Sequence, residues 1–196
     1  INGDDTVRMI YHGTSANTTG AGTHIGESYF NSNKDNNMYV GYMYTSGQVH
    51  GNGTNSTIKG VVDTWYNNNL SMYASKIATG GGATFCNDRT PYSGSGIGTE
   101  ETDYAPYKRV QAKQGLTFKC TNASDRFGTA IGLITADEVA YAGGVFNKNN
   151  TGYYLYTNQN YWTMSPSGYP FAGVLAVNRN GRLNSAYSVN TSYGVR

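Results

Sequence analysis

The clearest helical pattern of apolar positions lies between residues 55 and 70. Four apolar residues recur there at a spacing of one, three or four: Ile58, Val61, Val62 and Trp65. Asn55 or Ser56 precedes them as a residue that can cap a helix. The pattern predicts an amphipathic helix with Trp65 packed in the core. A Trp65 that contacts a ligand is the alternative interpretation.

A second helix is marked by its two ends, in the segment GLITADEVAYAGG at residues 132–144. Thr135 and Glu138 have the spacing of a capping box, in which each side chain accepts a hydrogen bond from the other residue's backbone N–H. Ile134 and Val139 stand where a hydrophobic staple belongs, and the glycine pair that follows favours a left-handed end. We expect a short helix in which Thr135 and Glu138 have a structural role.

Strand-like stretches occur near both ends of the chain. They are Val7–Gly13, Met38–Thr45, Gly152–Thr157, Asn160–Met164, Gly173–Asn178 and Arg182–Val189. Asn180-Gly181 lies between the last two and is a strong signal for a hairpin turn. Residues 79–128 show no regular pattern, and a long irregular segment of this kind is usually functional or cross-linked.

This order of elements predicts an α+β fold with a small antiparallel sheet, two short helices and long irregular loops. The length fits a single domain over residues 1–196. The chain begins at Ile1 and stops at Arg196 directly after a strand-like segment. We therefore expect the parent protein to continue beyond both ends.

Cys86 and Cys120, the two cysteines of the chain, flank 33 residues of the irregular segment. We expect them to form a disulfide that stabilises the fold by about 3–4 kcal/mol. Two buried thiols in a reducing compartment are the alternative. No metal site is expected, because His12, His24 and His50 lack the paired spacing of zinc ligands.

Composition favours an extracellular protein at a cell surface. Charged residues make up only 13% of the chain, whereas Asn (22 residues), Gly (26) and Tyr (18) are abundant. Neutral polar side chains of this kind close turns and cover a loop-rich surface. The net charge of +2, without a basic cluster, argues against a nucleic-acid partner. No apolar run is long enough for this segment to insert into a membrane.

Candidate catalytic chemistry is sparse. No Gly-x-Ser-x-Gly segment occurs, and neither cysteine has a histidine near it in the sequence. The glycine-rich SGSGIG at residues 93–98 lacks the preceding strand and following helix of a phosphate-binding loop. Calcium bound at the surface is an alternative. The candidate segments are Asp4-Asp5, residues 33–37 and residues 100–103, but the spacing of their side chains matches no known calcium loop. We expect no cofactor and no enzymatic activity.

Residues 153–193 are rich in Tyr and Asn. Rigid aromatic area combined with adaptable hydrogen bonding is typical of recognition surfaces. The candidate ligand-binding residues are Tyr153, Asn158, Asn160, Tyr169, Asn178, Asn180, Asn184, Tyr187, Asn190 and Tyr193. The alternative is an ordinary polar surface in an Asn-rich protein.

Three segments, GLITADEVAYAGG, YWTMSPSG and GRLNSAYSVNTSYGVR, resemble a family of bacterial extracellular domains. The family is common in gut Firmicutes, is often fused behind a prepilin-like or signal segment, and is similar over nearly the whole chain. The segments also resemble the C-type-lectin-like fold shared by formylglycine-generating enzymes and the variable proteins of diversity-generating retroelements. The resemblance implies that Trp162 lies in a core strand ended by Pro166, with Arg196 in the closing strand.

The resemblance implies a scaffold that presents loops, because this fold by itself does not fix a function. The oxidase branch uses cysteines near its C-terminal end, and this chain has none after Cys120. The calcium motifs of the sugar-binding branch are also missing. We expect a recognition or adhesion domain for a protein or glycan of a host or microbial surface. There are two alternatives. One is a structural subunit of a surface filament or pilus, and the other is an enzyme on the formylglycine-generating scaffold.

Overall fold

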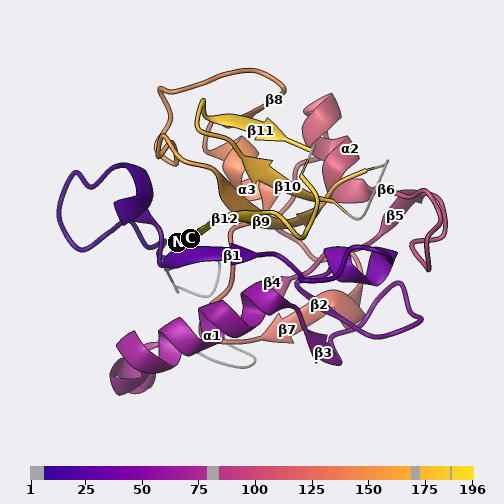
Figure 1. Ribbon diagram of the computed structural model, residues 1–196, viewed down its shortest axis with the longest axis horizontal. Helices are drawn as coiled ribbons and strands as arrows, with labels where there is room; N and C mark the ends of the chain where they lie inside the picture. Colours follow the sequence, from indigo (N-terminus) through magenta and orange to yellow (C-terminus); the bar gives the residue numbers. More distant parts are fainter. Residues whose placement is uncertain (1–6, 79–83, 169–172, 186) are drawn as a thin grey trace.

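The protein has an α+β fold built around a six-stranded sheet (Figure 1). The computed structural model describes residues 7–78, 84–168, 173–185 and 187–196. The α-helices are α1 (Thr57–Asn69), α2 (Ala105–Ala112) and α3 (Ala136–Tyr141). The 3-10 helices are η1 (Gly20–Thr23), η2 (Asn37–Val40), η3 (Ser71–Lys76) and η5 (Ala123–Asp125).

The main sheet is mixed, which corrects the expectation of an antiparallel one. In spatial order its strands are β1 (Gly26–Tyr29), β12 (Ser192–Val195), β9 (Tyr161–Pro166), β10 (Val174–Val177), β11 (Arg182–Asn184) and β8 (Val145–Phe146). β9, β10 and β11 pair antiparallel, as the Asn180-Gly181 turn predicts. The closing strand β12 lies between β1 and β9 and runs parallel to β9, and β8 runs parallel to β11.

Both faces of the sheet are covered, so the central strands are apolar almost throughout. Trp162 and Met164 of β9 lie in one core cluster together with residues of α1. Leu175 and Val177 of β10 lie in the other cluster, with residues of α2 and α3. Every residue of β9 and β10 is buried. The sheet is therefore the buried middle layer of the fold, and the surface segments pack around it.

Trp162, expected in the core, is fully buried and links two strands that are distant in sequence. Its indole Nε1 donates a hydrogen bond of 3.0 Å to the Ser28 carbonyl of β1. Its ring meets that of Phe30 edge-on, with centroids 5.8 Å apart. The β9 strand ends at Pro166, as the resemblance implied. This tryptophan thus joins β9 to the edge strand β1, with β12 between them.

Helix α1 forms where the periodicity predicts it, but Trp65 lies outside the core. Ser56 caps the helix by accepting a hydrogen bond from the Lys59 N–H. Ile58 and Val62 are buried against the sheet, whereas Trp65 is half-buried and meets Tyr11 edge-on at 5.3 Å. Trp65 lies on the same helix face as Ile58 and Val62, but it belongs to neither core cluster, because its ring packs against Tyr11 instead.

Helix α3 carries the predicted capping box. The Thr135 hydroxyl accepts from the Glu138 N–H, and the Glu138 carboxylate accepts from the Thr135 N–H. Glu138 also pairs with Arg8. The two residues therefore have the structural role expected of them.

Other local predictions fail. Residues 7–13 and 152–157 contain no strand, and residues 38–45 divide into η2 and β2. The segment expected to be irregular contains α2 and two small two-stranded sheets, which pair β4 with β7 and β5 with β6. A third two-stranded sheet, earlier in the chain, pairs β2 with β3. Their bounds are β2 (Met43–Tyr44), β3 (Thr54–Asn55), β4 (Thr84–Cys86), β5 (Pro91–Ser93), β6 (Asp103–Tyr104) and β7 (Arg126–Gly128).

The predicted disulfide joins Cys86 to Cys120, with Cα atoms 5.3 Å apart. Cys86 ends β4, and β4 pairs with β7, which begins six residues after Cys120. The bond therefore closes the loop that contains α2. None of the helices described in the chain is long and apolar enough to cross a membrane.

The chain end is held by Arg196, which is 5% exposed. Its guanidinium donates to the carbonyls of Leu155 (2.8 Å) and Tyr11 (3.2 Å), and it lies 2.7 Å from Nδ1 of His12. The closing strand is thereby tied to two neighbouring segments.

Stability should fall as the pH is lowered from 6.5 towards 4, because of His24. Burial, followed by the charge of Arg196, lowers the pKa of His24 to about 4. The unfolded chain then binds a proton near pH 6.5 that the folded chain does not, so the free energy of unfolding falls by about 2 kcal/mol over this interval. Urea unfolding of the wild type and of His24→Asn at several pH values tests this. Parallel pH profiles for the two proteins would refute it.

Candidate functional site

The predicted Tyr and Asn residues do not form one surface. The turn at residues 178–181 follows β10, whereas residues 187 and 188 lie beside the start of β10. The two groups therefore lie at opposite ends of that strand. Tyr169 lies outside the described residues.

Three predicted residues are buried and serve the fold. They are Tyr153, Asn178 and Asn184. The Asn178 Oδ1 accepts hydrogen bonds from the N–H groups of Asn180 (2.9 Å) and Arg182 (3.1 Å), so its side chain builds the β10–β11 turn. Burial raises the pKa of Tyr153 above its usual value and keeps its hydroxyl neutral. These three residues are out of reach of a ligand, which corrects their assignment to the recognition surface.

Asn158, Asn160 and Asn180 lie together at the turn end of β10. Asn158 and Asn180 are exposed. Asn160 is half-buried, and its Oδ1 accepts from the Arg179 N–H at 2.9 Å. The Asn180 carbonyl accepts from the Asn150 N–H, which holds the turn against the segment before β9. Half-buried Tyr156 lies beside these amides, because its hydroxyl donates to Asn158 Oδ1 at 3.3 Å.

Tyr187 and Tyr193 form an aromatic shelf over Trp162. Tyr187 lies beside the start of β10, whereas Tyr193 precedes Gly194, whose N–H donates to the Asn160 carbonyl. The two tyrosine rings meet edge-on at 4.9 Å, and the Tyr193 ring lies 5.0 Å from that of Trp162. Both tyrosines are half-buried, and nearby Asn190 is exposed. Burial, followed by the proximity of Tyr187, raises the pKa of Tyr193 to about 12, so its hydroxyl remains protonated. The shelf combines ring surface with neutral hydroxyls.

Near the start of β10, four residues that the sequence analysis did not choose as ligand-binding residues form a polar-aromatic rim: Tyr92, Asp103, Tyr107 and Lys108. Tyr92 is 69% exposed. The Lys108 ammonium lies 2.6 Å from Asp103 Oδ2, 5.0 Å from the Tyr107 ring centroid and 5.5 Å from that of Tyr92. The hydrogen bond to Asp103 raises the pKa of Lys108 above its usual value. The rim therefore offers an aromatic face, a fixed cation and a carboxylate side by side.

The rim is mounted on the β5–β6 hairpin and the first turns of α2. Asp103 pairs with Ser93 across the hairpin, and α2 begins directly after β6, with Pro106 in its first turn. Pro106 suits that position, because it has no N–H to leave unpaired. The following residues, Tyr107 and Lys108, project from this fixed start.

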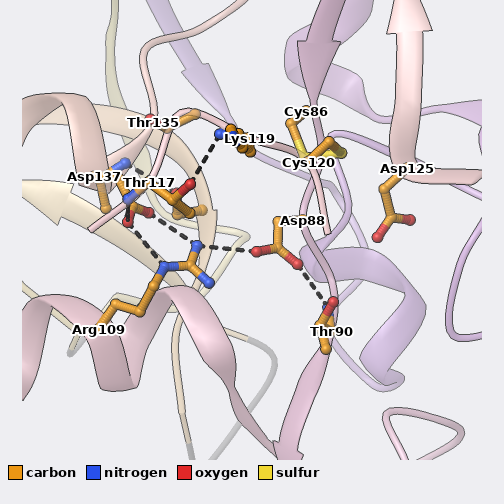
Figure 2. A network of polar contacts seen from close by, with 12 residues as sticks. Cys86, Asp88, Thr90, Arg109, Thr117, Lys119, Cys120, Asp125, Thr135 and Asp137 are labelled. Carbon is orange, nitrogen blue, oxygen red and sulfur yellow. Dashed lines mark hydrogen bonds and ion pairs between the residues drawn. A yellow bond between two sulfur atoms is a disulfide. The ribbon is translucent and has the colours of Figure 1, made fainter. Parts of the chain in front are cut away.

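Arg109, the residue after Lys108, fixes α2 to neighbouring segments of the chain (Figure 2). Its guanidinium makes two hydrogen bonds to Asp137 of α3, of 2.9 and 3.0 Å, and one of 2.9 Å to Asp88. Asp137 also accepts from the Thr117 N–H. Figure 2 shows Arg109 lying between the two carboxylates, with the Cys86–Cys120 bond nearby. The rim is thus supported by a paired, largely buried ionic cluster.

The end of β9 reaches the rim through Gly168. A Cβ atom at this position would lie 2.0 Å from Asp103 Oδ1 and 2.8 Å from the Tyr107 ring, so a side chain here would displace both rim residues. The preceding Ser167 donates to the Ser185 carbonyl, on the segment that leads to the shelf. The rim and Ser185, which precedes Tyr187 by two residues, therefore both lie beside residues 167–168.

The rim was missed because its members are spread over residues 92–108 with no common spacing. The available signal was DYAPYKR, where Pro106 marks a helix start. Among the described residues, no group of three His, Cys, Asp or Glu side chains could hold a metal. Asp103, one of the carboxylates considered for calcium, is paired with Lys108.

No family model, curated protein or solved structure matches the chain.

Proposed function

We propose that the chain is an extracellular recognition domain with a C-type-lectin-like fold, which binds a protein or glycan on a host or microbial surface through its polar-aromatic rim. The exposed ring of Tyr92, held beside the Lys108–Asp103 pair, is the observation that carries this proposal. Aromatic anchors next to fixed polar groups contribute much of the energy at recognition surfaces.

Three structural features support the proposed fold and location. The buried strand that contains Trp162 lies beside the closing strand β12, and buried Arg196 follows β12 directly. The disulfide suits an oxidising compartment outside the cytosol. The core and the ionic cluster hold the rim in place, which lowers the entropy lost when a ligand binds.

The proposal predicts that Tyr92→Ala weakens ligand binding by about tenfold, the loss expected of an aromatic anchor. The ligand is first identified with the wild-type domain on a glycan array and on a panel of host and microbial surface proteins. Affinity is then measured by surface plasmon resonance.

Tyr73→Ala is the matched control. Tyr73 is 54% exposed on η3 and belongs to neither the rim nor the shelf. Its loss should leave affinity unchanged. Absence of binding on both panels, or equal affinities of the Tyr92→Ala protein and the wild type, would refute the proposed function.

A further inference from the structure

A small apolar pocket lies between the C-terminal ends of α2 and α3 and strand β8. Its wall residue Phe146 meets the ring of Tyr107, a rim residue, edge-on at 5.6 Å. Its volume is about 140 Å³. The apolar walls are Val110, Leu116, Ala140, Val145 and Phe146. An apolar cavity of about 150 Å³ in a protein core holds a benzene molecule. This pocket therefore has room for one branched aliphatic side chain, and it is open at the surface.

An exposed aromatic pair stands beside the pocket. Phe118 is 67% exposed and Tyr141 is 58% exposed, with ring centroids 4.6 Å apart. The Tyr141 hydroxyl donates to the carbonyl of Leu116, a wall residue. Tyr141 also follows the wall residue Ala140 in α3. Aromatic residues are enriched in protein–protein interfaces, where they surround the side chains that enter pockets.

The charges around the pocket are positive. Lys113 lies in its wall, Lys119 follows Phe118, and Lys148 comes two residues after β8. All three lysines are exposed, and no described carboxylate lies within ion-pair distance of them. The nearest acidic residues of α3, Asp137 and Glu138, are already paired with arginines. The pocket therefore complements an acidic partner.

We propose that this pocket is a docking site for an acidic protein segment that inserts one branched apolar side chain. The pocket accepts the side chain, the Phe118–Tyr141 pair covers its flank, and Lys113 contacts a neighbouring carboxylate. The site lies at the C-terminal end of α2, whereas the rim lies at the N-terminal end of that helix. The inference is independent of the proposed function, because it uses none of the rim residues.

The test is an NMR titration of the isotopically labelled domain with millimolar N-acetyl-Glu-Leu-Glu-amide. Two further peptides are controls, one with Lys in place of both Glu residues and one with Ser in place of Leu. We expect the acidic leucine peptide alone to shift amide signals at residues 110–116 and 140–146. No shifts, shifts confined to other regions, or equal shifts with either control peptide would overturn the proposal.

Two variants sharpen the result. Lys113→Glu should lower the affinity for the acidic peptide about fivefold, because it turns an attractive exposed charge pair into a repulsive one. Ala140→Leu fills the pocket from its own wall and should abolish the shifts, while a thermal melt shows that the domain remains folded. Lys76→Glu on η3 makes the same charge change at an exposed lysine outside the pocket. An equal loss with Lys76→Glu would show a net-charge effect and overturn the docking site.

Discussion

Replacing Arg109 by methionine should lower the free energy of unfolding by about 3 kcal/mol, because it leaves two largely buried carboxylates without their cation. Asp137 and Asp88 have side chains that are 3% and 9% exposed, and both accept hydrogen bonds from the guanidinium. Urea unfolding followed by circular dichroism measures the loss.

A charge-free version of the same cluster separates this effect from lost packing. The triple variant Arg109→Met, Asp88→Asn, Asp137→Asn carries no stranded charge, so it should be more stable than Arg109→Met alone. If the triple variant is no more stable, uncompensated charge is not the cause. Because Lys108 adjoins Arg109, the single variant should also loosen the rim.

Removing the Cys86–Cys120 bond should cost about 3–4 kcal/mol, since it releases a loop of 33 residues in the unfolded chain. The bond also closes the segment that contains α2 and stands beside the β4–β7 pair. The expected change appears as a lower urea midpoint in the Cys86→Ala, Cys120→Ala double variant.

A reducing agent provides the control for the disulfide prediction. Dithiothreitol should lower the stability of the wild type towards that of the double variant and leave the double variant unchanged. Equal stability of oxidised and reduced wild type would contradict a stabilising bond. The affinity of the reduced protein for the rim ligand, measured at a urea concentration below its unfolding midpoint, reports whether α2 keeps its position.

The helices that could be predicted from sequence are those with local start signals. Ser56 caps α1 and Thr135 caps α3, each through an amide only three residues away. Helix α2 has no side-chain cap, and its position is fixed by Arg109 contacts to Asp88 and Asp137, which are 21 and 28 residues away. Long-range pairing of this kind leaves no periodic trace in the sequence.

The strands show the same dependence on contacts between residues that are distant in the sequence. β1 has the sequence GESY, with one buried residue, and it is a strand because β12 pairs with it. Residues 7–13 look more like a strand in sequence, yet the Tyr11 carbonyl accepts from the Arg196 side chain in a segment without strand structure. For β9 and β10, burial on both faces made the apolar runs easy to recognise.

The candidate site was the least predictable part. Abundant Asn suggested a contact surface, but Asn178 uses its side chain to close a turn, which is a common role of this residue. The rim depends on a hairpin that brings residue 92 near residues 103–108, and the sequence gives no spacing for it. Exposure, the property that separates Tyr92 from Tyr153, exists only in the folded chain.

Helix α2 presents two adjacent basic residues to opposite environments. Arg109 points inward to the carboxylates, while Lys108 stands at the surface beside Tyr92. Under the proposed function, folding and ligand choice are therefore encoded at neighbouring but separate positions. Specificity can drift by substitution at the outer position while the inner one keeps the helix seated, so one framework can serve a succession of different partners.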